Sequence, residues 1–144
     1  MRKLLLLSLI TPFHFAQIFA QNTWTQKASM PTVGRHTAVS FAIAGKGYLG
    51  TGVLANIGYT DDFWEYDPIT DSWTQKTNFP GGIRAFATGF AIGSKGYLGT
   101  GTSTGLDLFN DFWEYDPIAN SWTQKANLGG QQRAAATSFV IGGK

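Results

Sequence analysis

The stretch "DFWEYDPITDSWTQK", residues 62–76, returns as "DFWEYDPIANSWTQK", residues 111–125, with only two letters changed. The same step of 49 residues separates three tryptophans and three arginines: Trp24, Trp73, Trp122, Arg35, Arg84 and Arg133. When residues 35–83 are aligned with residues 84–132, more than half of the positions are identical. A period of 20 to 50 residues is typical of solenoids, propellers and arrays of small units. The repeat therefore decides the fold class before any single motif does.

Each repeat is predicted to form four short strands. Apolar stretches at 37–43 and 85–92 suit a first strand, and glycine-containing turns then reverse the chain into "GYLGTG". "DFWEYD" alternates between the two faces of a third strand, and "WTQK" follows a Pro/Asp/Ser turn as the fourth. No stretch shows a convincing helical period, so the sequence predicts an all-β fold.

Four strands in each 49-residue repeat match the four-stranded blade that a β-propeller repeats around its axis. The glycines of the second strand fit this arrangement, because they let neighbouring backbones or central groups approach closely. These glycines are Gly50, Gly52, Gly99 and Gly101. A β-bulge in an ordinary strand is the alternative interpretation of the same residues.

The chain resembles the kelch-repeat family of β-propellers from Thr23 to Lys144. The resemblance rests on an arginine opening the first strand, "GYLGTG" where the family usually has a Gly-Gly doublet, and an aromatic pair in strands 3 and 4. That pair is a tyrosine followed seven positions later by a tryptophan: Tyr66 with Trp73 and Tyr115 with Trp122. Gly-Thr-Gly in place of Gly-Gly departs from the pattern. The repeated phrase is similar to kelch arrays of secreted proteins of Gram-negative bacteria.

The resemblance implies an incomplete kelch-type propeller, with two full four-stranded blades and parts of two others. The expected divisions are a signal peptide at 1–20, an N-terminal fourth strand of a closing blade at 21–32, repeats at 33–81 and 82–130, and the start of a third repeat at 131–144. Kelch propellers normally close with five to seven blades. We therefore expect either that the chain is a fragment of a longer product, with further blades, or that self-association closes the ring.

The N-terminus has the pattern of a secretory signal. A basic start, an apolar stretch at 4–10 and a small residue before the expected cleavage point precede Gln21. A membrane anchor is the alternative, but polar residues and Pro12 interrupt the segment, which is shorter than the ~20 apolar residues of a spanning helix. We expect a secreted, extracellular or cell-surface bacterial protein, with the periplasm as alternative and no membrane span after cleavage.

Composition excludes several classes of function. The formal net charge is +2, with two of the positive residues in the expected leader, so nothing favours nucleic acid as a partner. The chain has no cysteine, which removes disulfides and thiolate nucleophiles. No metal-ligand spacing or phosphate loop is present, and we expect no cofactor. Galactose oxidase, a kelch propeller, holds copper with a Tyr–Cys cofactor, which this chain cannot reproduce.

Framework residues have two interpretations. The three repeated tryptophans could stack on sugar rings, but their recurrence favours packing between blades. The three repeated arginines could bind an anionic sugar or carboxylate, or could link carbonyls or a carboxylate of the neighbouring blade. The paired carboxylates Glu65 with Glu114 and Asp62 with Asp111 do not predict a glycosidase, because equivalent positions give equivalent environments.

Two segments break the repeat. Residues 53–61 and 102–110, which join strands 2 and 3, match at no position, whereas the framework around them is nearly copied. Such loops are where individual units acquire distinct contacts, and we single out Tyr59, Asp61, Asp107 and Phe109. Drift in an unconstrained loop is the alternative. Connections between repeats should emerge at the same end, by strand parity.

These observations predict a secreted, non-catalytic kelch scaffold that binds a protein or carbohydrate through the face formed by the strand 2–3 and strand 4–1 connections. A fragment of a sugar-acting propeller enzyme, similar to the sialic-acid epimerases or to galactose oxidase, is one alternative. A purely structural repeat of a surface adhesin is another.

Overall fold

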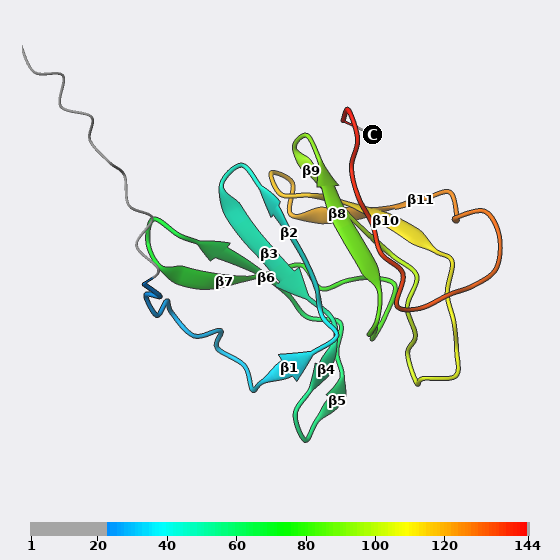
Figure 1. Cartoon of the computed structure of the whole chain (residues 1–144), viewed down its shortest axis with the longest axis horizontal. Helices are drawn as coiled ribbons and strands as arrows, with labels where there is room; N and C mark the ends of the chain where they lie inside the picture. Colours follow the sequence, from blue (N-terminus) through cyan, green and yellow to red (C-terminus); the bar gives the residue numbers. More distant parts are fainter. Residues whose placement is uncertain (1–22, 144) are drawn as a thin grey trace, which may run out of the picture.

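The computed structural model describes residues 23–143, which contain eleven β-strands in three antiparallel sheets and no helix (Figure 1). The all-β prediction is confirmed. None of the three sheets closes on itself. The expected signal peptide at 1–20, together with Gln21, lies outside the described residues.

The first repeat forms one four-stranded sheet. Its strands, in spatial order, are β2 (Val39–Ile43), β3 (Lys46–Gly50), β6 (Phe63–Asp67) and β7 (Ser72–Lys76). Phe41 lies opposite Tyr48, and Tyr48 lies opposite Glu65, so these three side chains share one face of the sheet. The sheet is sequential and needs no crossover.

The second repeat forms an equivalent sheet. Its strands are β8 (Thr88–Ile92), β9 (Lys95–Gly99), β10 (Phe112–Asp116) and β11 (Ser121–Lys125). Phe90 lies opposite Tyr97, which lies opposite Glu114, as the 49-residue step requires. The inner strands β2 and β8 lie side by side, so the two sheets pack face to face in sequence order.

A small third sheet was not predicted. β1 (Arg35–His36) pairs with β4 (Val53–Leu54), which pairs with β5 (Gly58–Tyr59). The first strand was expected to begin at Thr37, but β2 begins at Val39, because Thr37 has a φ of 55° that a strand cannot accommodate and that separates β1 from β2. Phe86, 49 residues later, has a φ of 53° and divides the second repeat in the same way.

The core lies between the two four-stranded sheets. Ile43, Tyr48 and Phe63 of the first sheet are buried against Tyr115, with Trp122 packed beside them. The Phe63 ring centroid lies 4.9 Å from those of both Tyr115 and Trp122, in edge-to-face geometry. A second cluster joins Val39 to Phe79 and Leu98. The main buried contacts are therefore contacts between repeats rather than within one.

The N-terminal segment at 23–32 forms no strand, and it contacts the first sheet at Ala28. The Trp73 indole N–H donates to the Ala28 carbonyl at 2.9 Å, and the Ala28 N–H donates to Asp71. In the second repeat, Trp122 donates to the Thr77 carbonyl at 3.0 Å, and the Thr77 N–H donates to Asn120. Ala28 therefore takes the place, against the first repeat, that Thr77 takes against the second.

Candidate ligand-binding face

In each four-stranded sheet, one connection joins the second strand to the third: 51–62 joins β3 to β6, and 100–111 joins β9 to β10. These connections, and those that follow the fourth strands β7 and β11 (77–87 and 126–135), emerge at one end of the sheets, with the β1–β4–β5 sheet (Figure 1). We call this end the loop face. The opposite end consists of the β2–β3, β6–β7, β8–β9 and β10–β11 turns. In the β6–β7 turn, the Asp67 carboxylate accepts a hydrogen bond from the Ile69 N–H at 2.8 Å, which fixes a tight connection.

An arginine clamp holds the first repeat together at the base of the loop face. Arg35 donates from both terminal nitrogens to the Asp62 carboxylate, at 2.7 and 2.6 Å, and also to the Thr51 carbonyl. The Trp64 indole N–H donates to Asp62 at 2.8 Å. Burial alone would raise the pKa of Asp62, but the hydrogen bonds from Arg35 and Trp64 outweigh it and hold that pKa below its ordinary value.

The second repeat carries the same clamp, more deeply buried. Arg84 donates to Asp111 at 2.7 and 3.0 Å and to the Thr100 carbonyl at 2.7 Å, and Trp113 donates to Asp111 at 2.9 Å. The Arg84 guanidinium lies 3.8 Å from the ring centroid of Phe109, close enough for a cation–π contact. Only 1% of the Arg84 side chain is exposed.

The hydrogen bonds of the two clamps indicate a structural role for Arg35 and Arg84. The terminal nitrogens of Arg35 and Arg84 donate mainly to a carboxylate and to carbonyls of the surrounding protein, and only 7% and 1% of the two side chains are exposed. The carboxylate belongs to the same repeat as its arginine, not to a neighbouring one. Neither arginine offers a site for an anionic ligand in this structure, and Asp62 and Asp111 are likewise engaged.

Arg133 occupies the corresponding position but in a different environment. It is exposed, and its Nε donates to the Gln131 carbonyl at 3.0 Å. Among residues 23–143, no carboxylate lies within ion-pair distance of it. Of the three arginines singled out from the sequence, it is the one whose guanidinium is accessible.

The loop residues singled out from the sequence all lie on the loop face but differ in role. Tyr59 is half-buried in β5, and its hydroxyl lies beside Gly105 of the next loop. Asp61 accepts a hydrogen bond from Asn78 at 3.2 Å, which ties two connections together. Asp107 is exposed and accepts from Thr104 at 3.2 Å, within its own loop. Phe109 covers Arg84, so its role here is in packing.

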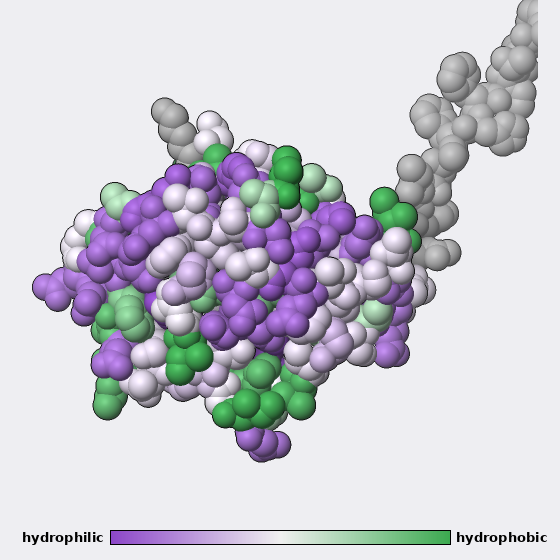
Figure 2. Space-filling model, turned by 180° about the vertical axis from the view of Figure 1, so that it is seen from behind, coloured by the Kyte–Doolittle hydropathy of each residue, from purple (hydrophilic) through white to green (hydrophobic). Residues whose placement is uncertain are grey.

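Exposed apolar side chains on the loop face were not anticipated. They come from both kinds of connection, and they are Ile57, Ile83, Phe86, Leu106, Leu108 and Leu128. Ile57 is 69% exposed and Leu106 is 89% exposed, at the tips of the two strand 2–3 connections. Apolar side chains project along the lower edge of the molecule in Figure 2, the end at which these connections lie. Isolated apolar residues within Gly- and Asn-containing loops were the signal that could have identified them.

An open hollow of about 460 Å³ lies on the same face. It is lined by Leu108 and by Gly130, Gln131 and Gln132 of the following connection. Glutamine amides offer both donors and acceptors, so the hollow combines one apolar wall with neutral polar groups. Such a lining suits hydroxyls or peptide groups better than a charged ligand.

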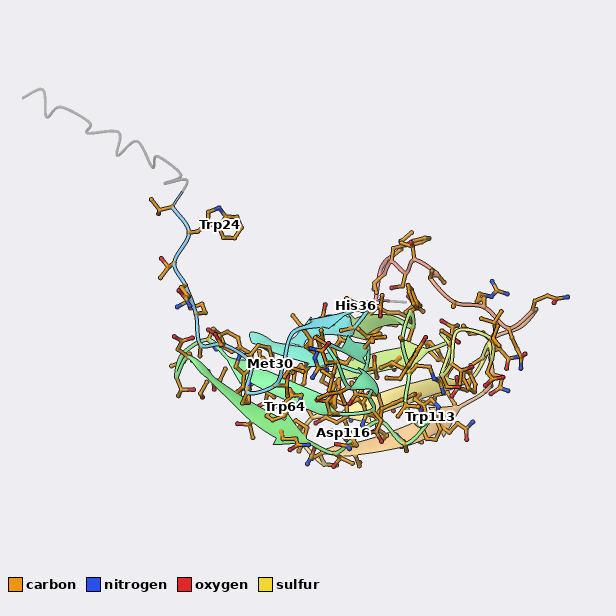
Figure 3. All side chains as sticks on the ribbon, turned by 90° about the horizontal axis from the view of Figure 1, so that it is seen from below. Trp24, Met30, His36, Trp64, Trp113 and Asp116 are labelled. Carbon is orange, nitrogen blue, oxygen red and sulfur yellow. The ribbon has the colours of Figure 1, made fainter. Side chains whose placement is uncertain are left out.

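The repeated framework anchors do not share one environment. Trp122 packs between the repeats, and Trp73 packs on Tyr66 with ring centroids 5.0 Å apart. Trp24 is fully exposed and projects from the body of the molecule (Figure 3). A Cβ on Gly50 or Gly52 would come within 2.6 Å of a backbone carbonyl, and Gly99 and Gly101 repeat that crowding. These four glycines therefore lie where backbones approach closely.

Glu65 and Glu114 lie on the sheets, away from the loop face. Glu65 accepts from Lys46 at 2.9 Å and from Tyr48 at 2.7 Å; burial raises its pKa, but these hydrogen bonds bring it below the ordinary value. Glu114 accepts from Tyr97 at 2.7 Å, which lowers its pKa in the same direction. Both carboxylates accept from a tyrosine and have lowered pKa values, so they show no contrast of the kind that an acid and a base require.

Within residues 23–143, no group of three or more histidine, aspartate or glutamate side chains could hold a metal ion. The same residues contain no helix long and apolar enough to cross a membrane.

Comparison with known proteins gives a likeness of fold. No family model and no curated protein matches the chain. Among solved structures, the chain is similar to that of YjhT, with 26% sequence identity and a TM-score of 0.67. The match covers 81% of this chain and 34% of YjhT. The chain therefore spans about a third of the length of the solved structure that it resembles.

Proposed function

We propose that this chain forms consecutive blades of a kelch-type β-propeller and acts as a secreted, non-catalytic binding module. Two four-stranded sheets related by a 49-residue step, packed face to face along their inner strands, support the propeller. The charged, apolar and small-residue pattern at the N-terminus supports secretion. The ligand is a protein or a glycan.

The observation that carries the binding proposal is the apolar loop face. Large apolar side chains are exposed on connections that differ between the repeats, whereas at the opposite end only the equivalent isoleucines of the β6–β7 and β10–β11 turns, Ile69 and Ile118, are exposed. Variable, accessible apolar groups beside the hollow at Gln131 and Gln132 offer contact area and hydrogen bonds to a neutral partner. The buried arginine clamps fix the base from which these connections project.

Binding can be tested with the secreted protein on a glycan array and against surface proteins of the same source. Leu106→Asp and Ile57→Asp should each weaken binding at least tenfold, because each places a charge within the contact. Ile118→Asp is the matched control, since Ile118 is 91% exposed at the opposite end and should leave binding unchanged. Equal loss in all three variants, or no loss in any, would refute the loop face as the binding surface.

A further inference from the structure

The backbone takes a left-handed turn at the same place in each repeat, just before β2 and β8. Thr37 has a φ of 55°, Phe86 of 53° and Ala135 of 56°, at successive steps along the repeat. Threonine and phenylalanine seldom adopt this conformation, because the side chain crowds the backbone there. Strain of this kind persists only where the surrounding structure imposes it, and it is concentrated at functional positions.

Backbone contacts hold the three turns in a row. The Phe86 N–H donates to the Thr37 carbonyl at 3.2 Å, and the Ala135 N–H donates to the Phe86 carbonyl at 2.8 Å. A Cβ on Gly52 would lie 2.6 Å from a carbonyl oxygen of the first turn, and Gly101 meets the second turn in the same way. The backbone of the turns is therefore fixed by contacts that do not depend on their side chains.

We call the three turns, at 36–38, 85–87 and 134–136, the inner rim. Other left-handed positions that recur keep one kind of residue: threonine at 51 and 100, and aspartate or asparagine, which suit turns, at 71 and 120. The left-handed position of the inner rim instead carries threonine, phenylalanine and alanine in turn. A fixed backbone with an exchangeable side chain is expected of a residue that contacts a ligand.

Phe86 is the large side chain of the inner rim, and it stays accessible between its neighbours. Its exposed fraction is 41%, although the turns before and after it, at Thr37 and Ala135, are both present and bonded to it. The exposure of Phe86 is therefore not caused by a missing neighbouring turn.

We propose that Phe86 is the stacking platform for one ring of a neutral sugar, which the first turn of the inner rim holds by hydrogen bonds to its hydroxyls. The inference rests on the proposed function, since the inner rim belongs to the loop face. It selects a glycan from the two kinds of partner named there, and it identifies the residue that contacts it.

The size of the exposed ring favours a sugar over a protein. A phenylalanine buries about 150–250 Å² when it is fully covered, so an exposed fraction of 41% leaves roughly 60–100 Å² for a ligand. A standard protein interface needs about 800 Å² on each side. The remaining side chains of the second and third turns are alanines, so the rim offers a single ring, which matches one sugar ring.

The charges around the inner rim favour a neutral sugar. Arg35 and Arg84, which precede the first two turns, are buried and donate to carboxylates of their own repeats. The first turn offers the Thr37 hydroxyl and the exposed His36 as hydrogen-bonding partners for sugar hydroxyls. Arg133, before the third turn, is accessible, so the test must also include an acidic sugar.

Affinity electrophoresis of the full chain, in native gels that contain dextran, galactan or mannan, tests the proposal. At least one of these neutral polysaccharides should retard the unsubstituted chain. Phe86→Ala and Phe86→Thr should each weaken the apparent affinity by about tenfold or more, whereas Phe86→Trp should retain it. The first two variants should fold, because Ala135 and Thr37 occupy the same backbone conformation. Thermal unfolding within about 5 °C of the unsubstituted chain checks this.

Trp24→Ala is the matched control for the loss of an exposed aromatic ring, because Trp24 is fully exposed and projects from the body of the molecule (Figure 3). It should leave the retardation unchanged. Equal retardation of Phe86→Ala and the unsubstituted chain, or loss with Trp24→Ala, overturns the inference. Retardation by polygalacturonate alone, or no retardation in any neutral gel, overturns it as well.

The inference and the proposed function can fail separately. A protein partner whose binding needs Ile57 and Leu106 but not Phe86 would keep the loop face and overturn the sugar platform. Loss of retardation with Phe86→Ala, but not with Ile57→Asp or Leu106→Asp, would keep the platform and remove the loop tips from the contact.

Discussion

Identical residues in the two repeats have different exposures, and the difference comes from their neighbours. Tyr115 and Leu98 are fully buried, whereas Tyr66 and Leu49, their counterparts, are half-buried. In the opposite sense, Phe63 is fully buried and Phe112 is not. Each sheet completes its own hydrogen bonds, but it obtains a buried core only from the sheet beside it.

The largest expected difference in the free energy of unfolding is between alanine variants of two equivalent phenylalanines. Phe63→Ala should cost about 3–5 kcal/mol of the free energy of unfolding, because it opens a cavity beneath Tyr115 and Trp122. Phe112→Ala removes the same atoms from a half-buried site and should cost about half as much. Urea unfolding of both variants measures the difference. Equal costs would mean that the second repeat does not have an uncovered face under those conditions.

The arginine clamps give the next largest effect. Arg84→Leu leaves the partly buried Asp111 without its cation and should cost about 3 kcal/mol. Arg133→Leu is the matched control at the equivalent position, since the exposed guanidinium there pairs with no carboxylate of the described chain, and its cost should stay within about 0.5 kcal/mol. Similar costs for both variants would contradict the assignment of Arg84 to a structural ion pair.

A third comparison uses glycine. A methyl group on Gly96 would collide with the Phe41 ring, whereas on Gly47 its nearest neighbour would be Tyr66 Cβ at 3.8 Å. Gly96→Ala should therefore destabilise by about 1–3 kcal/mol through overpacking, while Gly47→Ala should be nearly neutral. Thermal unfolding of the pair tests whether neighbour contact, rather than strand geometry, makes this position require glycine.

The smallest effect is expected from acid. The pKa values of Asp62 and Glu65 lie below their ordinary values of 3.8 and 4.5, so their contribution to stability is complete above about pH 4.5 and is lost as the pH falls through the lowered values. Glu65→Gln should flatten this loss more than Glu114→Gln, because two lysines and a tyrosine contact Glu65, whereas one of each contacts Glu114. Unfolding is followed from pH 7 downward, and equal acid sensitivity of the two variants and the unsubstituted chain would mean that these contacts do not stabilise the fold.

The sequence predicted the all-β fold because alternation in "DFWEYD" and the glycine turns are local signals with one structural solution. It did not predict the break at Thr37, since a left-handed threonine has no sequence signature and depends on the chain around it. The β4–β5 hairpin was missed for a similar reason: its residues lack the alternation of a longer strand, and β1 defines their partner.

The site was harder to predict than the fold. The repeat marked Arg35 and Arg84 as equivalent, but only the structure shows that Asp62 and Asp111 lie within their reach. Phe109 looked like a contact residue of a variable loop, yet it covers an arginine. Exposure of Ile57 and Leu106 depends on how the connections project, which residue type alone does not determine.

The clamp of arginine, aspartate and tryptophan closes within a single repeat, from Arg84 to Trp113 in one case and from Arg35 to Trp64 in the other. A stretch of gene that encodes one repeat therefore carries its buried ion pair with it. Duplication or deletion of that stretch leaves no clamp arginine or aspartate without its partner. Only the apolar faces of the flanking repeats must then pack against a new neighbour. Such a chain can change length by whole modules while its connecting loops diverge independently.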